Sequence, residues 1–222
     1  MTPSEQPRRI DITTASGVRI AADEWSGGSS DRSPVVLAHG GGQTRHSWGG
    51  TAAVLAEHGH RVISIDLRGH GDSDWAPDGD SHMSAFADDA LGVGLWIGSS
   101  VAWVGASLGG RTGLHASDAA PKLFTRLLLV DITPRPAAAG VSRILEFMGR
   151  DAVDGFATLD DAADAIAAYQ PHRLRPSDLS GLSKNLRLGD DGRWRWHWDP
   201  AVLYLRAGGT SEHARDRHHD DL

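Results

Sequence analysis

The sequence contains no cysteine among its 222 residues. This absence excludes a disulfide framework, a thiolate metal site and a cysteine nucleophile. Long apolar runs are also missing, so no segment is long enough to span a bilayer. The first residues, Met1 to Arg9, lack the apolar core of a signal peptide. We therefore expect a cytoplasmic protein that does not bind membranes.

Basic residues are in the minority. The 22 lysine and arginine residues are outnumbered by 29 aspartate and glutamate residues, which gives a formal net charge of −7. No basic stripe interrupts this balance, so the composition argues against a protein that binds nucleic acids. The length suits one domain with a single core and room for one insertion.

Segments with strand and helix character alternate over residues 1–131. Two segments of period two, Arg8–Thr13 and Val18–Trp25, predict an antiparallel hairpin. A continuous apolar run predicts a strand buried on both faces at Val35–Ala38, and further buried strands are predicted at Val101–Val104 and Leu127–Asp131. Arg61–Asp66 is predicted to be the strand that follows the first helix. Helices are predicted at Trp48–His58, from Ser84 to about Leu91, and at Leu108–Ser117. This alternation predicts a mostly parallel α/β sheet flanked by helices, which binds ligands beyond the carboxyl ends of its strands.

Two regions depart from this regular alternation. Gly92, Gly94 and Gly98 follow the helix that starts at Ser84, and we expect them to interrupt it. From residue 132 to residue 200 the strands give way to short helical pieces, predicted at 141–150, 151–158 and 159–169. A tight turn over 188–194 then leads into Trp194, Trp196 and Trp198. We interpret 1–131 as the core and 132–200 as a helical lid over the strand tips.

The run Gly105 to Gly109 reads Gly-x-Ser-x-Gly and directly follows the buried strand predicted at Val101–Val104. Between a strand and a helix, this pattern forms a nucleophile elbow, a sharp turn that exposes the serine hydroxyl at the strand tip. Ser107 is therefore the candidate nucleophile. The alternative is an ordinary glycine-rich turn.

A second glycine run, His39 to Gly42, follows another buried strand. An enzyme with a serine nucleophile needs backbone N–H donors near the developing oxyanion, and glycines let the backbone approach closely. We expect the amides of Gly41 and Leu108 to be these donors, and His39 to support the loop. The alternative, a phosphate-binding loop, is disfavoured because no Lys-Ser/Thr follows and Gly-x-Gly-x-x-Gly is absent.

The run Asp66 to Ser73 (DLRGHGDS) follows the next strand. We expect it to be structural, with Gly69 and Gly71 in turns while Asp66 and Arg68 bond loop backbone.

Together, these motifs and the run LLLVDITPRP resemble the α/β-hydrolase superfamily. In detail, Ile10 to Pro200 is similar to the bacterial cofactor-free serine hydrolases often labelled non-haem peroxidases or haloperoxidases, which are relatives of epoxide hydrolases. The resemblance implies a Ser-His-Asp triad for acyl transfer, with no cofactor and no metal. Epoxide hydrolases carry aspartate at the elbow, so Ser107 favours esters, thioesters, amides or peracids. Perhydrolase or haloperoxidase chemistry would be a side activity of the same site.

In this family the acid follows a strand after the lid, and the histidine follows one more strand and helix. Residues 201–206 are predicted to be that first strand, and Glu212 would then stand in the acid's place. Only ten residues follow, with no apolar run among them. The last strand and helix of the family are therefore expected to be missing, and 201–222 to be a strand remnant with a polar tail. His218 and His219 are the candidate bases; the alternative is that they are solvated tail residues or a weak metal-binding patch. Asp131 is a second candidate acid, or a cap of the turn into the lid.

Two functional hypotheses follow. The first is a serine hydrolase that takes a small-molecule acyl substrate, with an apolar pocket lined by Phe147 and the lid tryptophans unless these side chains only pack the lid. The second is a shortened, non-catalytic homologue that acts as a binding module or has no activity. The oligomeric state is left open.

Overall fold

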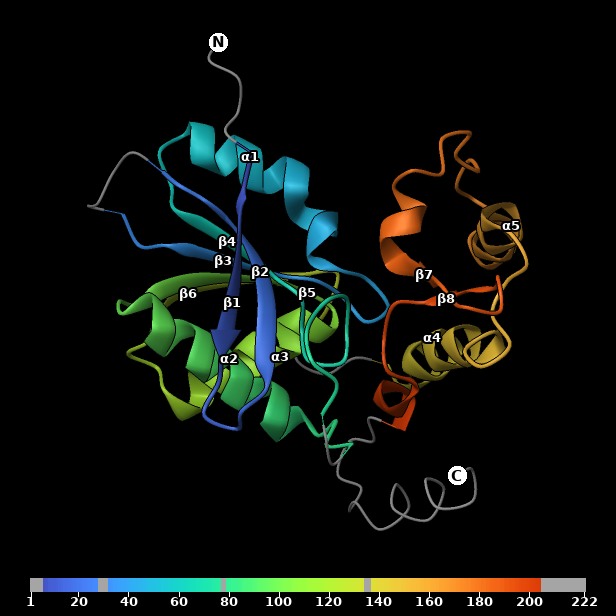
Figure 1. The fold of residues 1–222 in the computed structure, drawn as a ribbon. Helices are drawn as coiled ribbons and strands as arrows, with labels where there is room; N and C mark the ends of the chain where they lie inside the picture. The colour runs from blue at the N-terminus through green and yellow to red at the C-terminus, as the bar shows by residue number, and fades with distance from the viewer. Residues whose placement is uncertain (1–5, 28–31, 77–78, 134–136, 205–222) are drawn as a thin grey trace.

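The computed structural model describes residues 6–27, 32–76, 79–133 and 137–204 (Figure 1). Its centre is a six-stranded sheet in the order β1-β2-β4-β3-β5-β6. The strands are β1 (Arg8–Thr13), β2 (Arg19–Trp25), β3 (Val35–Ala38), β4 (Val62–Ile65), β5 (Val101–Ala106) and β6 (Phe124–Val130). β1 and β2 form the predicted antiparallel hairpin, and β2 pairs antiparallel with β4. The remaining pairs are parallel, as the buried apolar runs predicted.

Helices cover both faces of the sheet (Figure 1). One face packs against α1 (Gly49–Glu57), which follows the 3₁₀ helix η1 (Arg45–Trp48). The opposite face packs against α2 (Met83–Ile97) and α3 (Leu108–Ala119) and contains the larger apolar core. Within the described parts of the chain, no helix combines the length and the apolar character needed to cross a membrane.

The helix that was expected to break after Leu91 continues to Ile97, so that prediction is wrong. A Cβ atom at Gly92 would lie 3.2 Å from the Thr14 side chain, and one at Gly94 would lie 2.7 Å from Leu123 Cδ2. These glycines allow close packing of α2 and do not interrupt it. The helix ends at Gly98, whose φ of 77° places it in the left-handed region typical of a helix C-terminus.

β6 differs from the prediction in burial. It was predicted to be a buried strand, yet Leu128 is 57% exposed. β6 stands at one end of the strand order and pairs only with β5 among the described residues. An apolar run is thus compatible with an edge strand, and the sequence pattern could not distinguish an edge strand from a buried central strand.

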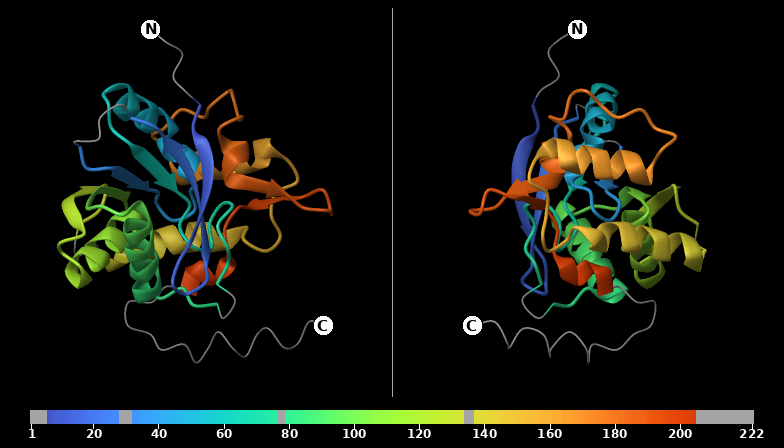
Figure 2. Two further views of the ribbon diagram at one scale, coloured as in Figure 1. Left: turned by 60° about the vertical axis from the view of Figure 1, so that its left-hand side comes forward. Right: turned by 90° about the vertical axis from the view of Figure 1, so that its right-hand side faces the viewer.

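Residues 137–204, called the lid segment here after the lid predicted at 132–200, contain α4 (Ala138–Arg150), α5 (Leu159–Tyr169) and a hairpin of β7 (Leu186–Leu188) and β8 (Trp194–Trp196). The 3₁₀ helices η2 (Leu182–Asn185) and η3 (Pro200–Tyr204) complete it. Figures 1 and 2 show α4, α5 and the hairpin gathered together beside the sheet. The predicted helix at 159–169 and the turn between β7 and β8 are confirmed.

Two other predictions in the lid segment are wrong. Residues 151–158 do not form a helix, because Gly155 (φ 63°) turns the chain so that Phe156 pairs with Trp194. A Cβ atom at Gly155 would lie 2.4 Å from the Trp194 carbonyl oxygen. The strand expected at 201–206 is replaced by η3 up to Tyr204, and residues 205–206 lie outside the described residues.

The aromatic residues of the lid segment mainly pack against one another. Phe147 stacks on Tyr169 at 4.2 Å between ring centroids, and Trp196 meets Phe156 edge-on at 5.3 Å. Trp198 is buried. Phe147 and Trp196 therefore act mainly as packing residues of the lid segment, which was the alternative to a predicted role as pocket walls.

Trp103 links β5 to α3 and is among the largest fully buried side chains. Its Nε1 donates a hydrogen bond of 2.9 Å to the Gly109 carbonyl oxygen. A Cβ atom at Gly113 of α3 would lie 2.3 Å from Trp103 Cδ1. The indole ring therefore occupies the space that a side chain at Gly113 would need.

We expect Gly113→Ala to lower the free energy of unfolding by about 1–3 kcal/mol, because overpacking against Trp103 outweighs the gain in helix propensity. Urea denaturation followed by circular dichroism measures this change. The matched control is Gly50→Ala in α1, where no atom lies within 4 Å of the new Cβ, so stability should stay constant or rise by up to about 1 kcal/mol. Equal effects of the two substitutions would contradict this account.

Candidate active site

Ser107 occupies the single position between β5 and α3. Its φ of 44° and ψ of −108° lie far from the regions that residues with side chains prefer. Hydrogen bonds fix the turn on both sides: Ser107 N donates to Val130 O at 3.0 Å, and Arg111 N donates to Ser107 O at 3.0 Å. This strained strand–turn–helix geometry is that of a nucleophile elbow.

The elbow requires glycine on both sides of Ser107. A Cβ atom at Gly105 would lie 2.3 Å from the Gly109 carbonyl carbon, and one at Gly109 would lie 2.5 Å from the Ala38 carbonyl oxygen. Both contacts are with backbone atoms, which cannot move aside. The Gly-x-Ser-x-Gly pattern thus reflects the close approach of α3 to β5 and β3.

The loop after β3 passes close to Ser107. A Cβ atom at Gly40 would lie 3.5 Å from Ser107 Cβ. The Gly40 carbonyl oxygen accepts hydrogen bonds from His39 Nδ1 at 2.7 Å and from Gln43 N at 3.1 Å. Because C=O and N–H point in opposite directions across a trans peptide, the Gly41 N–H is turned away from these two donors.

The N–H groups of Gly41 and Leu108 have no acceptor among the described residues. Leu108 is the first residue of α3, where no intrahelical acceptor exists. The two amides expected to stabilise an oxyanion are therefore free to donate.

His39 is fully buried and supports the loop. Leu67 N donates to its Nε2 at 3.0 Å, so Nδ1 carries the proton that bonds Gly40 O. Burial lowers the pKa of His39, which favours this neutral form. Both ring nitrogens are occupied, and none is left to accept a proton from Ser107.

The loop after β4 is tied to the loop after β3 by buried charges. Asp66 accepts hydrogen bonds from Arg45 N at 2.6 Å and from Asp72 N at 2.9 Å, and it forms an ion pair with the Arg45 guanidinium. Arg68 forms a second buried ion pair with Asp89 of α2. Burial lowers the pKa of His70 to about 3, so it too is neutral. These contacts agree with the structural assignment predicted for this loop.

Asp131 lies beside the serine at the tip of the neighbouring strand. Ala106 of β5 pairs with Val130 of β6, so Ser107 and Asp131 follow paired residues. Asp131 is exposed, adopts a φ of 53°, and has no hydrogen-bond or ion-pair partner among the described residues. Its carboxylate is therefore available to a further group.

The other predicted triad residues, Glu212, His218 and His219, lie outside the described residues. Within the described ranges, no histidine forms a hydrogen bond with Ser107. Among the described residues, the structure thus brings together the elbow, the two amides and Asp131, but no base.

Met148 of α4 is a site residue that the sequence reasoning missed. A Cβ atom at Gly42 would lie 3.3 Å from Met148 Cε, and one at Gly41 would lie 3.9 Å from it. The Leu108 side chain is close to the same point, at 4.0 Å from a Cβ on Gly41. Together they give the loop after β3 an apolar cover. The helical spacing of Val141, Leu145 and Met148 was the available signal.

Comparisons with known proteins agree with this geometry. A family model described as the alpha/beta hydrolase fold matches residues 33–186. An esterase of Mycobacterium tuberculosis, Rv0045c, is 33% identical over 185 residues, which cover 81% of this chain and 60% of the relative. A non-heme chloroperoxidase of Streptomyces lividans is 32% identical over 125 residues, which cover 55% of this chain and 44% of the relative.

Solved structures show the same fold. The crystal structure of an alpha/beta hydrolase from Novosphingobium aromaticivorans superimposes with a TM-score of 0.79 at 24% identity and covers 93% of this chain and 74% of that one. The chain spans 60% of the length of the esterase and 44% of that of the chloroperoxidase. The resemblance drawn from the motifs is confirmed: this chain belongs to the α/β hydrolase fold family.

Proposed function

We propose that this chain is a serine hydrolase that cleaves ester-like acyl substrates through a covalent acyl-enzyme on Ser107. The observation that carries the proposal is the strained backbone of Ser107 beside two N–H groups, of Gly41 and Leu108, that have no acceptor among the described residues. Strain of this kind concentrates at functional sites. The similarity to an esterase and to a non-heme chloroperoxidase supports the same reaction class.

In the proposed reaction, Ser107 Oγ attacks the acyl carbon and a base takes its proton. The carbonyl oxygen becomes an oxyanion, to which the N–H groups of Gly41 and Leu108 donate hydrogen bonds. Collapse of this intermediate breaks the bond to the alcohol, which leaves with the proton from the base. Water then attacks the acyl-enzyme by the same route, releases the acid and restores Ser107.

His218 is the proposed base, with Asp131 or Glu212 as the acid that orients it. We favour Asp131 because it follows the residue paired with Ala106 and its carboxylate is unpaired among the described residues. The φ of 53° at Asp131 is one that aspartate tolerates better than most residues.

The apolar side chains of Met148 and Leu108 near Gly41 favour an acyl group with apolar character. Hydrogen peroxide in place of water would convert the same acyl-enzyme into a peracid. We propose this perhydrolase chemistry as a side activity of the same site.

Replacement of Ser107 by alanine should abolish labelling by a fluorophosphonate probe and lower p-nitrophenyl ester turnover by at least about 10³-fold, because the nucleophile is lost. Gel fluorescence and initial rates measure the two effects. The control is Ser117→Ala in α3, the helix that follows Ser107. The Ser117 hydroxyl donates to the Leu114 carbonyl oxygen, and this variant should retain both signals. A parent chain that neither labels nor turns over substrate would favour the non-catalytic alternative.

The substitution Asp131→Asn tests the acid. Asparagine also tolerates a positive φ, so the fold should be kept while the base loses its negatively charged partner. We expect kcat to fall by about 10²–10⁴-fold with little change in melting temperature. The companion variant Glu212→Gln should then behave like the parent, whereas the opposite pattern would assign the acid to Glu212. A loss of melting temperature without a specific loss of kcat would instead make Asp131 a cap.

A further inference from the structure

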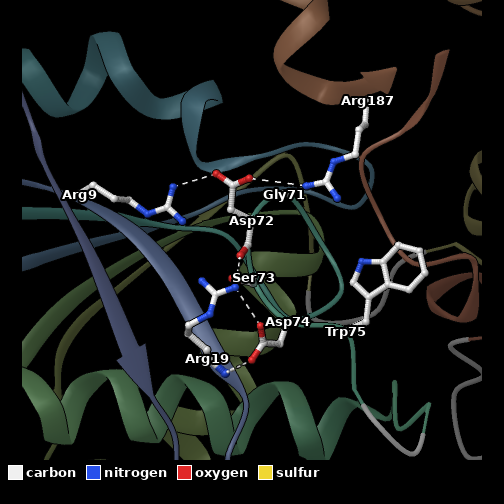
Figure 3. A pocket seen from close by; sticks show the side chains of 8 residues that line it. All are labelled: Arg9, Arg19, Gly71, Asp72, Ser73, Asp74, Trp75 and Arg187. Carbon is white, nitrogen blue, oxygen red and sulfur yellow. Dashed lines mark hydrogen bonds and ion pairs between the residues drawn. The ribbon is translucent and has the colours of Figure 1, made fainter. Parts of the chain in front are cut away.

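An open groove of about 630 Å³ lies on the core surface away from the elbow (Figure 3). The groove is lined by the loop after β4, by the edge hairpin of β1 and β2, and by β7 of the lid segment. Its charged and aromatic lining consists of Arg9, Arg19, Asp72, Asp74, Trp75 and Arg187. A smaller cavity of about 220 Å³ shares Gly71 and Asp72 with it and is lined by Lys184.

Two of the three arginines have close carboxylate partners. Arg9 Nη1 lies 2.8 Å from Asp72 Oδ2, and Arg19 Nη2 lies 2.9 Å from Asp74 Oδ1. Asp72 also accepts a hydrogen bond from Arg45 at 2.9 Å. The hydrogen bonds from Arg9 and Arg45 hold the pKa of Asp72 at about 2, although partial burial raises it. This carboxylate is therefore ionised and already engaged by two guanidinium groups.

Of the three arginines that line the groove, Arg187 has the most distant carboxylate partner. Its side chain is 62% exposed, and its Nη2 reaches the shared Asp72 only at 3.8 Å. Its other neighbour is His197 Nε2 at 2.5 Å. Burial and the nearby Arg187 charge lower the pKa of His197, so the imidazole accepts a hydrogen bond but carries no charge to offset the guanidinium.

Lys184 lies three residues before Arg187 and lines the adjoining cavity. Its ammonium group has no ion-pair partner among the described residues. Arg187 in the groove and Lys184 in the adjoining cavity are thus two cations of the lid segment without a carboxylate of their own among the described residues. In a chain with a net charge of −7, this concentration of positive charge is a local exception.

Trp75 supplies a planar apolar surface at the same groove. Its side chain belongs to the loop after β4 and remains 51% exposed, and Figure 3 shows it on the same side of the groove as Arg187. An exposed indole beside a guanidinium suits a ligand that combines a flat ring with an anionic group.

We propose that this groove binds a small organic oxyanion, a carboxylate or a phosphate monoester carried on an aromatic ring. Arg187 and Lys184 hold the anion, and Trp75 stacks on the ring. In the strand order, β3 lies between β4, whose following loop lines the groove, and β5, which precedes Ser107. The groove therefore does not depend on Ser107.

Isothermal titration calorimetry at low ionic strength tests the proposal with phenyl phosphate, benzoate, inorganic phosphate and benzyl alcohol as probes. We expect phenyl phosphate or benzoate to bind, the tighter of the two identifying the anion, while benzyl alcohol does not. Arg187→Gln should weaken binding by about tenfold or more, since a charged hydrogen bond is lost. Trp75→Leu should weaken the ring-bearing probes and leave inorganic phosphate unchanged.

The matched control is Arg126→Gln, which removes the same charge from β6 at the opposite edge of the sheet. Arg126→Gln should bind the probes as the parent does. Ser107→Ala should also bind them unchanged, so that binding in the groove is tested independently of the proposed hydrolase activity. Equal weakening by Arg126→Gln and Arg187→Gln, equal affinity for benzyl alcohol, or no heat from any probe would each overturn the proposal. Unchanged melting temperatures would show that the variants remain folded.

Discussion

The close approach of α3 to β5 and β3 is the constraint on which the candidate active site depends. Gly105 and Gly109 have no room for side chains, because backbone atoms of the adjoining elements lie where their Cβ atoms would be. This approach forces the chain through Ser107 in a strained conformation and leaves the Leu108 N–H at the start of α3 without an acceptor in the described parts of the chain. The indole of Trp103, bonded to the Gly109 carbonyl oxygen, holds the same junction from within the core.

The loop after β3 is held against this elbow by polar contacts that are buried. His39 connects the carbonyl of Gly40 to the amide of Leu67, and Arg45 connects the end of the loop to Asp66. A buried charge that loses its partner is strongly destabilising, so these pairs hold the loops after β3 and β4 in one arrangement. Rigid loops of this kind keep backbone amides oriented before a substrate arrives, which is the condition for effective oxyanion binding.

The lid segment is joined to the loop after β4 through backbone hydrogen bonds. Asp199 N donates to Gly69 O at 2.7 Å, and Gly71 N donates to His197 O at 2.7 Å. From this attachment Met148 reaches the glycines after β3, and Arg187 reaches the groove beside Asp72. One junction therefore shapes both the apolar cover of the candidate active site and the cationic groove.

The sequence by itself determined the strand and helix alternation, the elbow at Ser107 and the family, because these depend on local periodicity and on glycines at fixed spacing. It misjudged Gly92 and Gly94, whose purpose is close packing against Thr14 and Leu123, distant in the chain. Only the tertiary structure decided that β6 lies at the edge of the sheet formed by the described residues, that Gly155 turns the chain toward Trp194, and that Met148 meets the loop after β3. Each of these depends on which surfaces come together after folding, and no local pattern records that.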